Sequence, residues 1–234
     1  MSLWIKICGN TSLDDAQIAA EAGANALGFV FAPSPRRVTA AEVAAIVPEL
    51  PEAIEKIGVF VDASFEEIES TVHAARITGV QLHFKAPPEL PAQLRARFGP
   101  RLSILRVMRF GADGFAEAED ADRDNVDAVL VDSFSANAVG GTGLTYDWSV
   151  AASLFDKARI RGRRYIAAGG LTPENAGEAI LALRPAGVDV VSGVEAAPGH
   201  KDLQKVRAFI ANARAAHRGR NSDPNRPLCA SHKS

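Results

Sequence analysis

The stretch LWIKICGN, residues 3–10, holds the first predicted strand of the chain and the turn that follows it. Its apolar run, residues 3–8, is short and rich in β-branched and aromatic side chains, as buried strands are. The glycine fingerprint GxGxxG, typical of an open doubly wound sheet, does not follow it. Instead, Ser12 and Asp15 resemble a capping box at the start of an Ala-rich helix. These features favour a strand–helix unit of a closed barrel.

The same kind of unit recurs along the whole chain. Short runs of Val, Ile, Leu and Phe alternate with longer helix-like segments, at the spacing of a βαβ unit. Eight such units in about 200 residues match a single closed parallel barrel, the (β/α)₈ or TIM barrel. The predicted strands are residues 3–8, 26–31, 56–61, 79–83, 103–108, 128–132, 164–168 and 188–192.

Capping signals and breakers place the helices and the end of the domain. Thr39 and Ser64 are predicted N-caps, and Pro173 is expected at the first position of a helix. Residues 202–217 read as the closing helix, whereas a helix in the connection 110–126 is uncertain. The barrel domain is therefore expected to span residues 1–218. Residues 219–234 are polar and aperiodic, which predicts a disordered tail.

Composition excludes several classes of partner. The 234 residues are 47% hydrophobic with a formal net charge of −2, so no global field would attract nucleic acid or an acidic membrane. No run reaches the roughly 20 apolar residues of a membrane span, and no signal peptide is visible. Cys8 and Cys229 lie far apart and form no disulfide framework, which favours the cytoplasm. No metal-ligand spacing is present. Monomer and homodimer both remain open.

The carboxyl end of the first strand carries a cysteine. Reactive groups of such barrels lie at the carboxyl ends of the strands, where Cys8 is expected. Lys6 shares its side-chain parity, so both side chains are expected to point into the barrel. A nearby ammonium would favour a thiolate, which could act as a base. Two alternatives remain, namely Cys8 as a small buried hydrophobe and Lys6 as the ion-pair partner of an inward carboxylate such as Asp189.

An acidic residue ends the sixth predicted strand. Asp132 follows the apolar run 128–131 and would lie across the barrel mouth from Cys8. A carboxyl group in an apolar rim has a raised pKa, which keeps a proton available for donation. An acid/base pair is therefore geometrically possible. The alternative is an aspartate that only caps a loop.

Glycine-rich loops follow the last strands. Gly169-Gly170 and Ser192-Gly193 follow the seventh and eighth strands, the two loops that commonly bind phosphate in these barrels. Their backbone N–H groups can approach an anion closely. A third donor-rich loop contains Gly141. Glycines that simply make turns are the alternative. Together these loops indicate a phosphorylated small-molecule ligand.

Two further side chains are candidate ligand contacts. Arg36, held after Pro35, could aim its planar fork at a carboxylate, although a solvated arginine is the alternative. His83 ends the fourth strand, and its side chain is expected on the same face as that of Gln81. It is predicted to contact the substrate, although such a histidine is often only a hydrogen-bonding residue.

Together these segments resemble the phosphoribosylanthranilate isomerase family of tryptophan biosynthesis. The matching pieces follow in order from residue 5 to residue 202, and as a set they are highly specific. They are KICGN (6–10), GFVFAPSPRRV (28–38), GVQLH (79–83), VLVDS (129–133), GGTG (140–143), AAGGL (167–171) and GVDVVSGVE…PGHKD (187–202).

The resemblance implies a (β/α)₈ barrel without metal or cofactor that performs an Amadori rearrangement of N-(5'-phosphoribosyl)anthranilate. It implies that Cys8 is the general base, Asp132 the general acid and Arg36 the ligand of the anthranilate carboxylate. It also implies a phosphate grip from Gly169, Gly170, Ser192 and Gly193, to which Gly141 is added as a third loop. His83 and Asp189 are expected to contact the substrate.

Two other functions remain as alternatives. The isomerase of histidine biosynthesis performs the same rearrangement on an aminoimidazole ribotide, but that family places an aspartate where this chain has Cys8. A non-catalytic phosphate-binding barrel is compatible with the fold, since fold alone does not determine function. The presence of both Cys8 and Asp132 argues against this second alternative.

Overall fold

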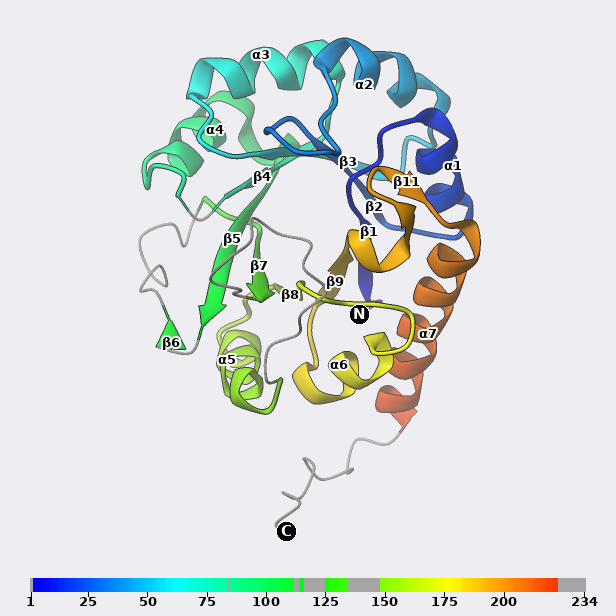
Figure 1. Cartoon of the computed structure of the whole chain (residues 1–234). Coiled ribbons are helices and arrows are strands. Elements are labelled where there is room, and N and C mark those ends of the chain that lie inside the picture. Colours follow the sequence, from blue (N-terminus) through cyan, green and yellow to red (C-terminus); the bar gives the residue numbers. More distant parts are fainter. Residues whose placement is uncertain (1, 84, 112–113, 116–124, 134–147, 223–234) are drawn as a thin grey trace.

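Eight parallel strands close into a barrel in the computed structural model, which describes residues 2–83, 85–111, 114–115, 125–133 and 148–222. The strand order is β4-β3-β2-β1-β9-β8-β7-β5, and a pairing of β4 with β5 closes the ring. Figure 1 shows the helices arranged around these strands. The barrel strands are β1 (Trp4–Ile7), β2 (Ala26–Val30), β3 (Glu55–Phe60), β4 (Gly79–Leu82), β5 (Ser103–Gly111), β7 (Ala128–Ser133), β8 (Tyr165–Ala167) and β9 (Gly187–Val190).

All eight predicted strands and the TIM-barrel class are confirmed. Three of the helices also begin where their caps predict. The side chains of Ser12, Thr39 and Ser64 each accept a hydrogen bond from the backbone N–H three residues later, and the last two complete capping boxes. The helices are α1 (Leu13–Glu21), α2 (Ala40–Ile46), α3 (Phe65–Ala75), α4 (Leu90–Phe98), α5 (Trp148–Ile160), α6 (Ala176–Leu183) and α7 (Leu203–Ser222).

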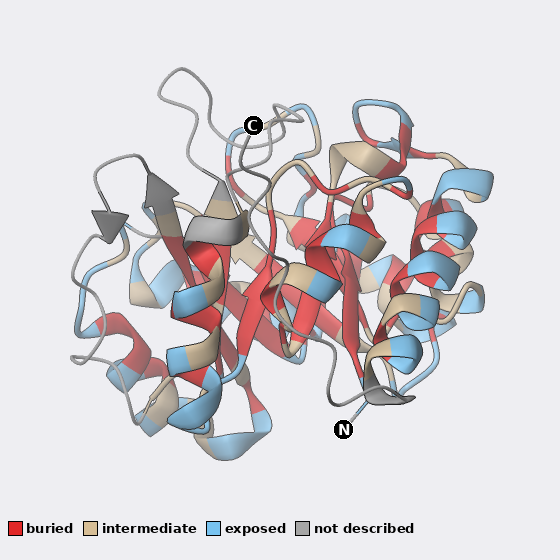
Figure 2. Ribbon diagram, turned by 90° about the horizontal axis from the view of Figure 1, so that it is seen from below, coloured by how far each residue is buried: buried red, intermediate tan, exposed pale blue. Residues whose placement is uncertain are grey.

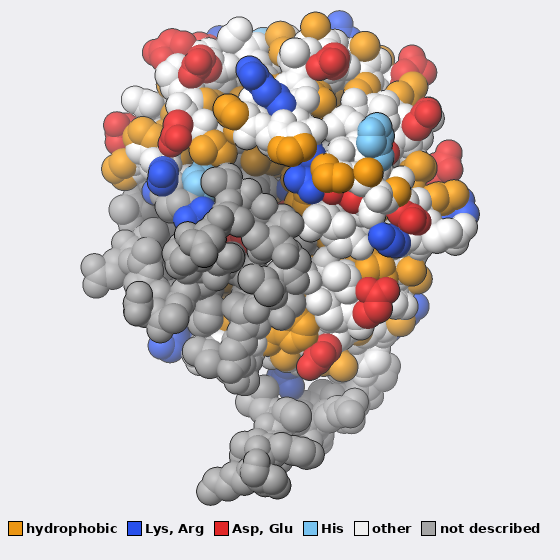
Figure 3. Space-filling view, in the orientation of Figure 1, with side chains coloured by type: hydrophobic (Ala, Val, Ile, Leu, Met, Phe, Trp, Pro, Cys, Tyr) orange, Lys and Arg blue, Asp and Glu red, His pale blue; other side chains and the backbone are white. Residues whose placement is uncertain are grey.

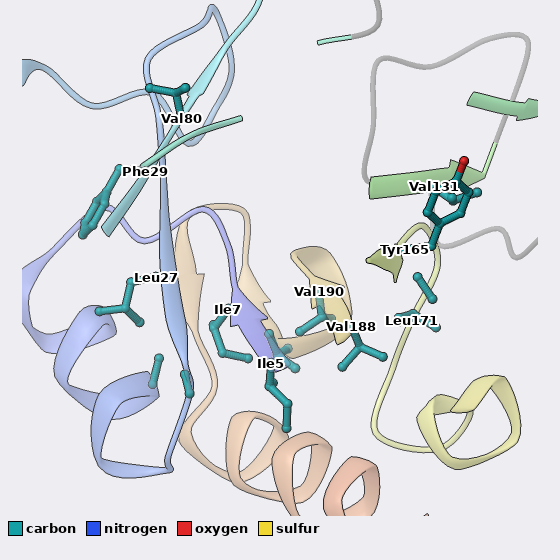
Figure 4. Close-up of a cluster of buried hydrophobic side chains, with 14 of the residues drawn as sticks. Ile5, Ile7, Leu27, Phe29, Val80, Val131, Tyr165, Leu171, Val188 and Val190 are labelled. Carbon is teal, nitrogen blue, oxygen red and sulfur yellow. The ribbon is translucent and has the colours of Figure 1, made fainter. Parts of the chain in front are cut away.

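Side chains at alternate strand positions point to opposite sides of the barrel wall and form two separate apolar clusters. Between the barrel and the helices lies the larger core, and Figure 4 shows some of its side chains, including Leu27 and Phe29 of β2. The opposite parity supplies a smaller cluster that includes Trp4, Ile57 and Leu130 and fills the barrel interior. Burial is therefore concentrated on the strands, while the outer helix faces are exposed (Figure 2). Polar side chains of the interior parity must lie above this cluster, at the barrel mouth.

Two connections differ from expectation. The expectation that Pro173 opens a helix is wrong, because α6 begins at Ala176 and Pro173 lies in the preceding turn. Asn175 organises that turn, since its side chain accepts from the Thr172 N–H and donates to the Gly170 carbonyl. In the described part of the connection 110–126, a short β6 (Gly114–Phe115) pairs antiparallel with β5.

The closing helix is longer than predicted. Helix α7 continues to Ser222, so the first residues of the predicted tail, 219–222, are helical. The rest of that segment, 223–234, with Cys229, lies outside the described residues.

Candidate active site

Cys8 lies in the loop directly after β1 and is 3% exposed. Its backbone N–H donates to the Val190 carbonyl of β9 at 2.9 Å. On the other side, the thiol packs over Gly28 of β2, where a Cβ atom would overlap with the sulfur. The predicted inward orientation of Cys8 is therefore confirmed.

A buried charge network lies beneath the thiol. The Lys6 ammonium, fully buried, donates to Asp189 Oδ1 and to Gln81 Oε1, each at 2.8 Å. Lys6 and Asp189 are register partners in the parallel ladder between β1 and β9. The same ammonium also interacts electrostatically with the Cys8 side chain. Lys6 therefore has both of the partners that its parity suggested, the thiol and an inward carboxylate.

The thiol form of Cys8 is favoured over the thiolate. Burial raises the pKa of Cys8, and the Asp189 carboxylate acts in the same direction, while Lys6 opposes both. Lys6 thus favours the thiolate, as expected, but burial and Asp189 outweigh its effect. Burial opposes the charge on Lys6, but Asp189 and Cys8 outweigh it, so the pKa of Lys6 is raised.

Arg36 reaches the same place from the loop after β2. An added Cβ on Gly9 would lie 2.8 Å from Arg36 Cδ, so the arginine stem crosses the backbone next to Cys8. The guanidinium is held by Glu195, through Nε at 2.8 Å to Oε1 and Nη2 at 2.6 Å to Oε2. This hydrogen bonding is the main reason that the pKa of Arg36 is raised. Arg36 is therefore not a solvated surface residue.

Glu195 and Lys201 are site residues that the sequence analysis missed. They are register partners in a small hairpin after β9, formed by β10 (Glu195–Ala197) and β11 (His200–Lys201). The Lys201 ammonium donates to the Cys8 carbonyl at 2.6 Å and to Glu195 Oε1 at 3.2 Å. The Pro-Gly turn at 198–199 was a hairpin signal, but nothing local indicated a contact with the first strand.

Asp132 lies near the carboxyl end of β7 and is half-buried. It has the parity of Ala128 and Leu130, two members of the interior cluster. Its register partner on β5 is Arg109. Between β7 and β1 stand β8 and β9, so Asp132 and Cys8 occupy well-separated sectors of one barrel mouth.

His83 follows β4 at the same mouth. Its backbone N–H donates to the Phe60 carbonyl, and the residue is half-buried. Burial lowers the pKa of His83, and the Arg109 charge lowers it further. A neutral imidazole is therefore favoured, which suits a hydrogen-bonding contact better than an ionic one.

The two glycine loops after β8 and β9 pack against each other. Gly193 approaches the backbone of residues 171–172 so closely that a Cβ atom would overlap with the Leu171 carbonyl oxygen. Gly169 and Gly170 adopt φ angles of 82° and 62°, which favour glycine. Among the described residues, the backbone hydrogen bonds use neither of their N–H groups. Ser192 begins the 3₁₀ turn η3 (Ser192–Val194), while Gly141 lies outside the described residues.

Acidic and basic side chains are interspersed around the face drawn in Figure 3. Within the described ranges, no group of three or more His, Cys, Asp or Glu side chains could hold a metal ion. None of the described helices combines the length and the apolarity needed to cross a membrane.

The chain matches a family model over residues 5–212, and that model describes N-(5'-phosphoribosyl)anthranilate (PRA) isomerase. The chain belongs to the PRA isomerase family. The match includes every described candidate, from the first strand to the hairpin with Glu195 and Lys201.

Bacterial relatives support the same assignment. The N-(5'-phosphoribosyl)anthranilate isomerase of Geobacter metallireducens is 42% identical over 212 residues, covering 90% of this chain and 98% of the relative. The Pelobacter propionicus isomerase is 43% identical over 207 residues, covering 88% and 93%.

Solved PRA isomerases share the fold. One from Thermotoga maritima has a TM-score of 0.77 at 34% identity and covers 91% of this chain and 99% of its own. Another, with a TM-score of 0.75, 34% identity and the same coverage, is a complex with reduced 1-(o-carboxyphenylamino)-1-deoxyribulose 5-phosphate. A third structure is described as mutually generated monomers of the dimeric Thermotoga maritima enzyme. A phosphorylated small molecule is therefore bound by a relative of the same architecture.

Proposed function

We propose that this chain catalyses the Amadori rearrangement of N-(5'-phosphoribosyl)anthranilate to 1-(2-carboxyphenylamino)-1-deoxyribulose 5-phosphate in tryptophan biosynthesis. The observation that carries the proposal is the placement of Cys8 and Asp132, which share the interior parity at one barrel mouth. One supplies a base and the other an acid, the two groups that this proton transfer needs.

Asp132 acts first, as the general acid. Its protonated carboxyl donates to the furanose ring oxygen, the C1–O bond breaks, and an iminium ion forms between C1 and the anthranilate nitrogen. Its carboxyl group is half-buried and shares the interior parity of Ala128 and Leu130, which supports this role at the barrel mouth.

Cys8 then removes the C2 proton, which the neighbouring iminium ion acidifies. A cationic iminium ion beside the thiol favours the thiolate, so the thiol first releases its proton to solvent and the thiolate acts as the base. The resulting enol-amine collapses to the ketone, as the C2 hydroxyl returns a proton to Asp132 and C1 gains one from Cys8. Both catalytic groups are thereby regenerated.

Three groups of residues hold the substrate. Arg36 binds the anthranilate carboxylate with the guanidinium N–H groups that Glu195 leaves available. The loops at Gly169-Gly170 and Ser192-Gly193 hold the phosphate, together with a third loop that contains Gly141. Asp189 and His83 contact the sugar. The constant phosphate anchor positions the reacting end through both steps.

The proposed setting is the cytoplasm, with the chain active as a monomer or homodimer without metal, cofactor or nucleic acid. Support comes from Cys8, a buried free thiol that the proposed base requires in reduced form. A reducing compartment keeps such thiols free.

An activity assay with phosphoribosylanthranilate tests the proposal. The labile substrate is generated in situ, and the carboxyphenylamino ketone is identified by mass spectrometry. Aminoimidazole ribotide serves as the parallel substrate, and the wild-type chain is expected to convert the anthranilate derivative in preference. Binding of the phosphate ester without turnover would refute the enzymatic proposal.

A further inference from the structure

The Glu195 carboxylate forms ion pairs with two cations beside Cys8, namely Arg36 and Lys201. It is 6% exposed, and its two oxygens accept from Arg36 Nε and Nη2, from Lys201 Nζ at 3.2 Å and from the Gly199 N–H at 3.3 Å. Burial opposes its charge, but Arg36 and Lys201 outweigh burial, so the pKa of Glu195 is lowered. The carboxylate is therefore ionised at neutral pH and holds both cations.

This contact determines how the Arg36 fork is presented. Glu195 occupies the edge of the guanidinium formed by Nε and Nη2. The N–H groups of Nη1 and the second N–H of Nη2 remain, and together they form a second bidentate edge. Because the stem is confined over Gly9, a fixed guanidinium plane fixes the direction of that second edge.

Lys201 ties the same carboxylate to the catalytic loop. Its ammonium bridges Glu195 and the Cys8 carbonyl, while its backbone N–H donates to Asp15 of α1 at 2.7 Å. The hairpin that carries Glu195 is thereby anchored to both the end of β1 and the start of α1. Arg36 is thus oriented relative to Cys8, and not only relative to its own loop.

We propose that Glu195 is a positioning residue that directs the free edge of Arg36 at the carboxylate of the substrate, so that recognition of this carboxylate depends on Glu195 as much as on Arg36. The inference rests on the proposed function, since it assumes that the wild-type chain converts phosphoribosylanthranilate. Removal of one partner of a buried ion pair destabilises the fold, so the test must separate a role in presentation from a role in folding.

Two substrates separate these roles. The phosphoribosyl derivative of anthranilate carries the carboxylate, and the corresponding derivative of aniline lacks it. The ratio of their kcat/KM values measures carboxylate recognition alone. In Glu195→Gln, the neutral amide cannot accept from both cations, and the ratio is expected to fall by about tenfold or more. Arg36→Met should lower it similarly, and the double variant should show no further loss.

Two other variants complete the experiment. Glu195→Asp keeps the charge on a shorter stem and should give an intermediate ratio, which also serves if Glu195→Gln does not fold. Asp127→Asn removes a structural ion pair with Arg95 outside the mouth and should leave the ratio unchanged. If the Glu195 variants slow both substrates by the same factor, the inference is wrong. A wild-type chain that converts neither substrate refutes the proposed function instead.

Discussion

The Cys8 thiol occupies the space that a side chain on Gly28 would need. An added Cβ on Gly28 would lie 2.9 Å from Cys8 Cβ and would overlap with the sulfur. Gly28 belongs to the interior parity of β2, because its neighbours Leu27 and Phe29 pack in the outer core. The strand next to β1 therefore leaves room for the thiol at the barrel mouth.

Gly28→Ala is expected to displace the thiol and to lower kcat by at least roughly tenfold, since small misplacements of a reacting group are costly. The overpacking should also cost about 1–3 kcal/mol of stability. Gly58→Ala is the matched control, because its Cβ would crowd Ile77 Cδ1 at 2.6 Å in the outer core, away from the thiol. Thermal unfolding and steady-state kinetics of both variants check this. An equal loss of kcat in the control would contradict it.

Removal of either proton-transfer group should slow the chemical step. Cys8→Ser and Asp132→Asn are each expected to lower kcat by roughly 10²-fold or more, the scale of acid/base groups. Binding of inorganic phosphate, measured by competition, should change little, because neither side chain belongs to the proposed phosphate loops. Near-wild-type turnover in one variant would remove that residue from the mechanism.

The pH dependence of Cys8 alkylation tests the electrostatics of the resting site. Because burial raises the pKa of Cys8 above its ordinary value, the thiolate fraction at any given pH is lower than in an unfolded chain. The rate of iodoacetamide inactivation, measured in a Cys229→Ser background, should reach its plateau at a higher pH in the folded protein than in the unfolded chain. A plateau at lower pH would show that the cations dominate.

Asp189→Asn tests whether the Asp189 carboxylate raises the pKa of Cys8. The Asp189 carboxylate raises the pKa of Cys8, whereas Lys6 lowers it. The isosteric amide can still accept from the Lys6 ammonium but carries no charge. The alkylation profile of the variant should therefore shift to lower pH than that of the parent, and a shift to higher pH would contradict the network.

Arg36→Met should act mainly on binding. Methionine keeps part of the apolar stem over Gly9 but loses the fork, so KM for phosphoribosylanthranilate is expected to rise by about tenfold or more. Arg37→Met is the control, because Arg37 is the adjacent exposed arginine and should leave KM unchanged. A pure kcat effect of the Arg36 variant would argue against a simple binding role.

The barrel was predictable because its strands are buried on both faces. Runs such as 128–131 are continuously apolar, and their spacing leaves room for one helix each. Helix starts at Ser12, Thr39 and Ser64 were equally predictable, since the capping contact is local. The start of α6 was not, because Asn175 organises the turn through hydrogen bonds that compete with a helix at Pro173.

The site was only partly predictable. Strand parity correctly places Lys6 and Cys8 inside the barrel, and it allows the pair with Asp189. The contact of Arg36 with Glu195 joins residues 159 positions apart, and no local pattern indicates it. The direction of the Cys8 pKa depends on burial, which outweighs the adjacent ammonium and is known only once the fold is known.

The contact between the two glycine loops offers a test of the phosphate grip. On Gly193, a Cβ would lie 3.0 Å from the Leu171 carbonyl carbon and 3.1 Å from Thr172 Cα, and these backbone atoms cannot move aside as a side chain can. Gly193→Ala should therefore push the loops after β8 and β9 apart. We expect the inhibition constant of inorganic phosphate and the KM of the substrate to rise together, by about tenfold or more.

Gly177→Ala is the matched control for this variant. Its Cβ would make an ordinary contact, 3.8 Å from Ala216 Cβ, within α6 just beyond the same loop. It should leave phosphate inhibition unchanged and stabilise the helix by about 0.5–1 kcal/mol, since alanine favours helix over glycine. An unphosphorylated ribosyl derivative distinguishes a loss of phosphate binding from a distortion of the barrel mouth, because its turnover does not depend on the phosphate loops. If Gly193→Ala lowers that turnover as much as it lowers turnover of the phosphorylated substrate, the loops contribute to the shape of the barrel mouth and not specifically to phosphate binding.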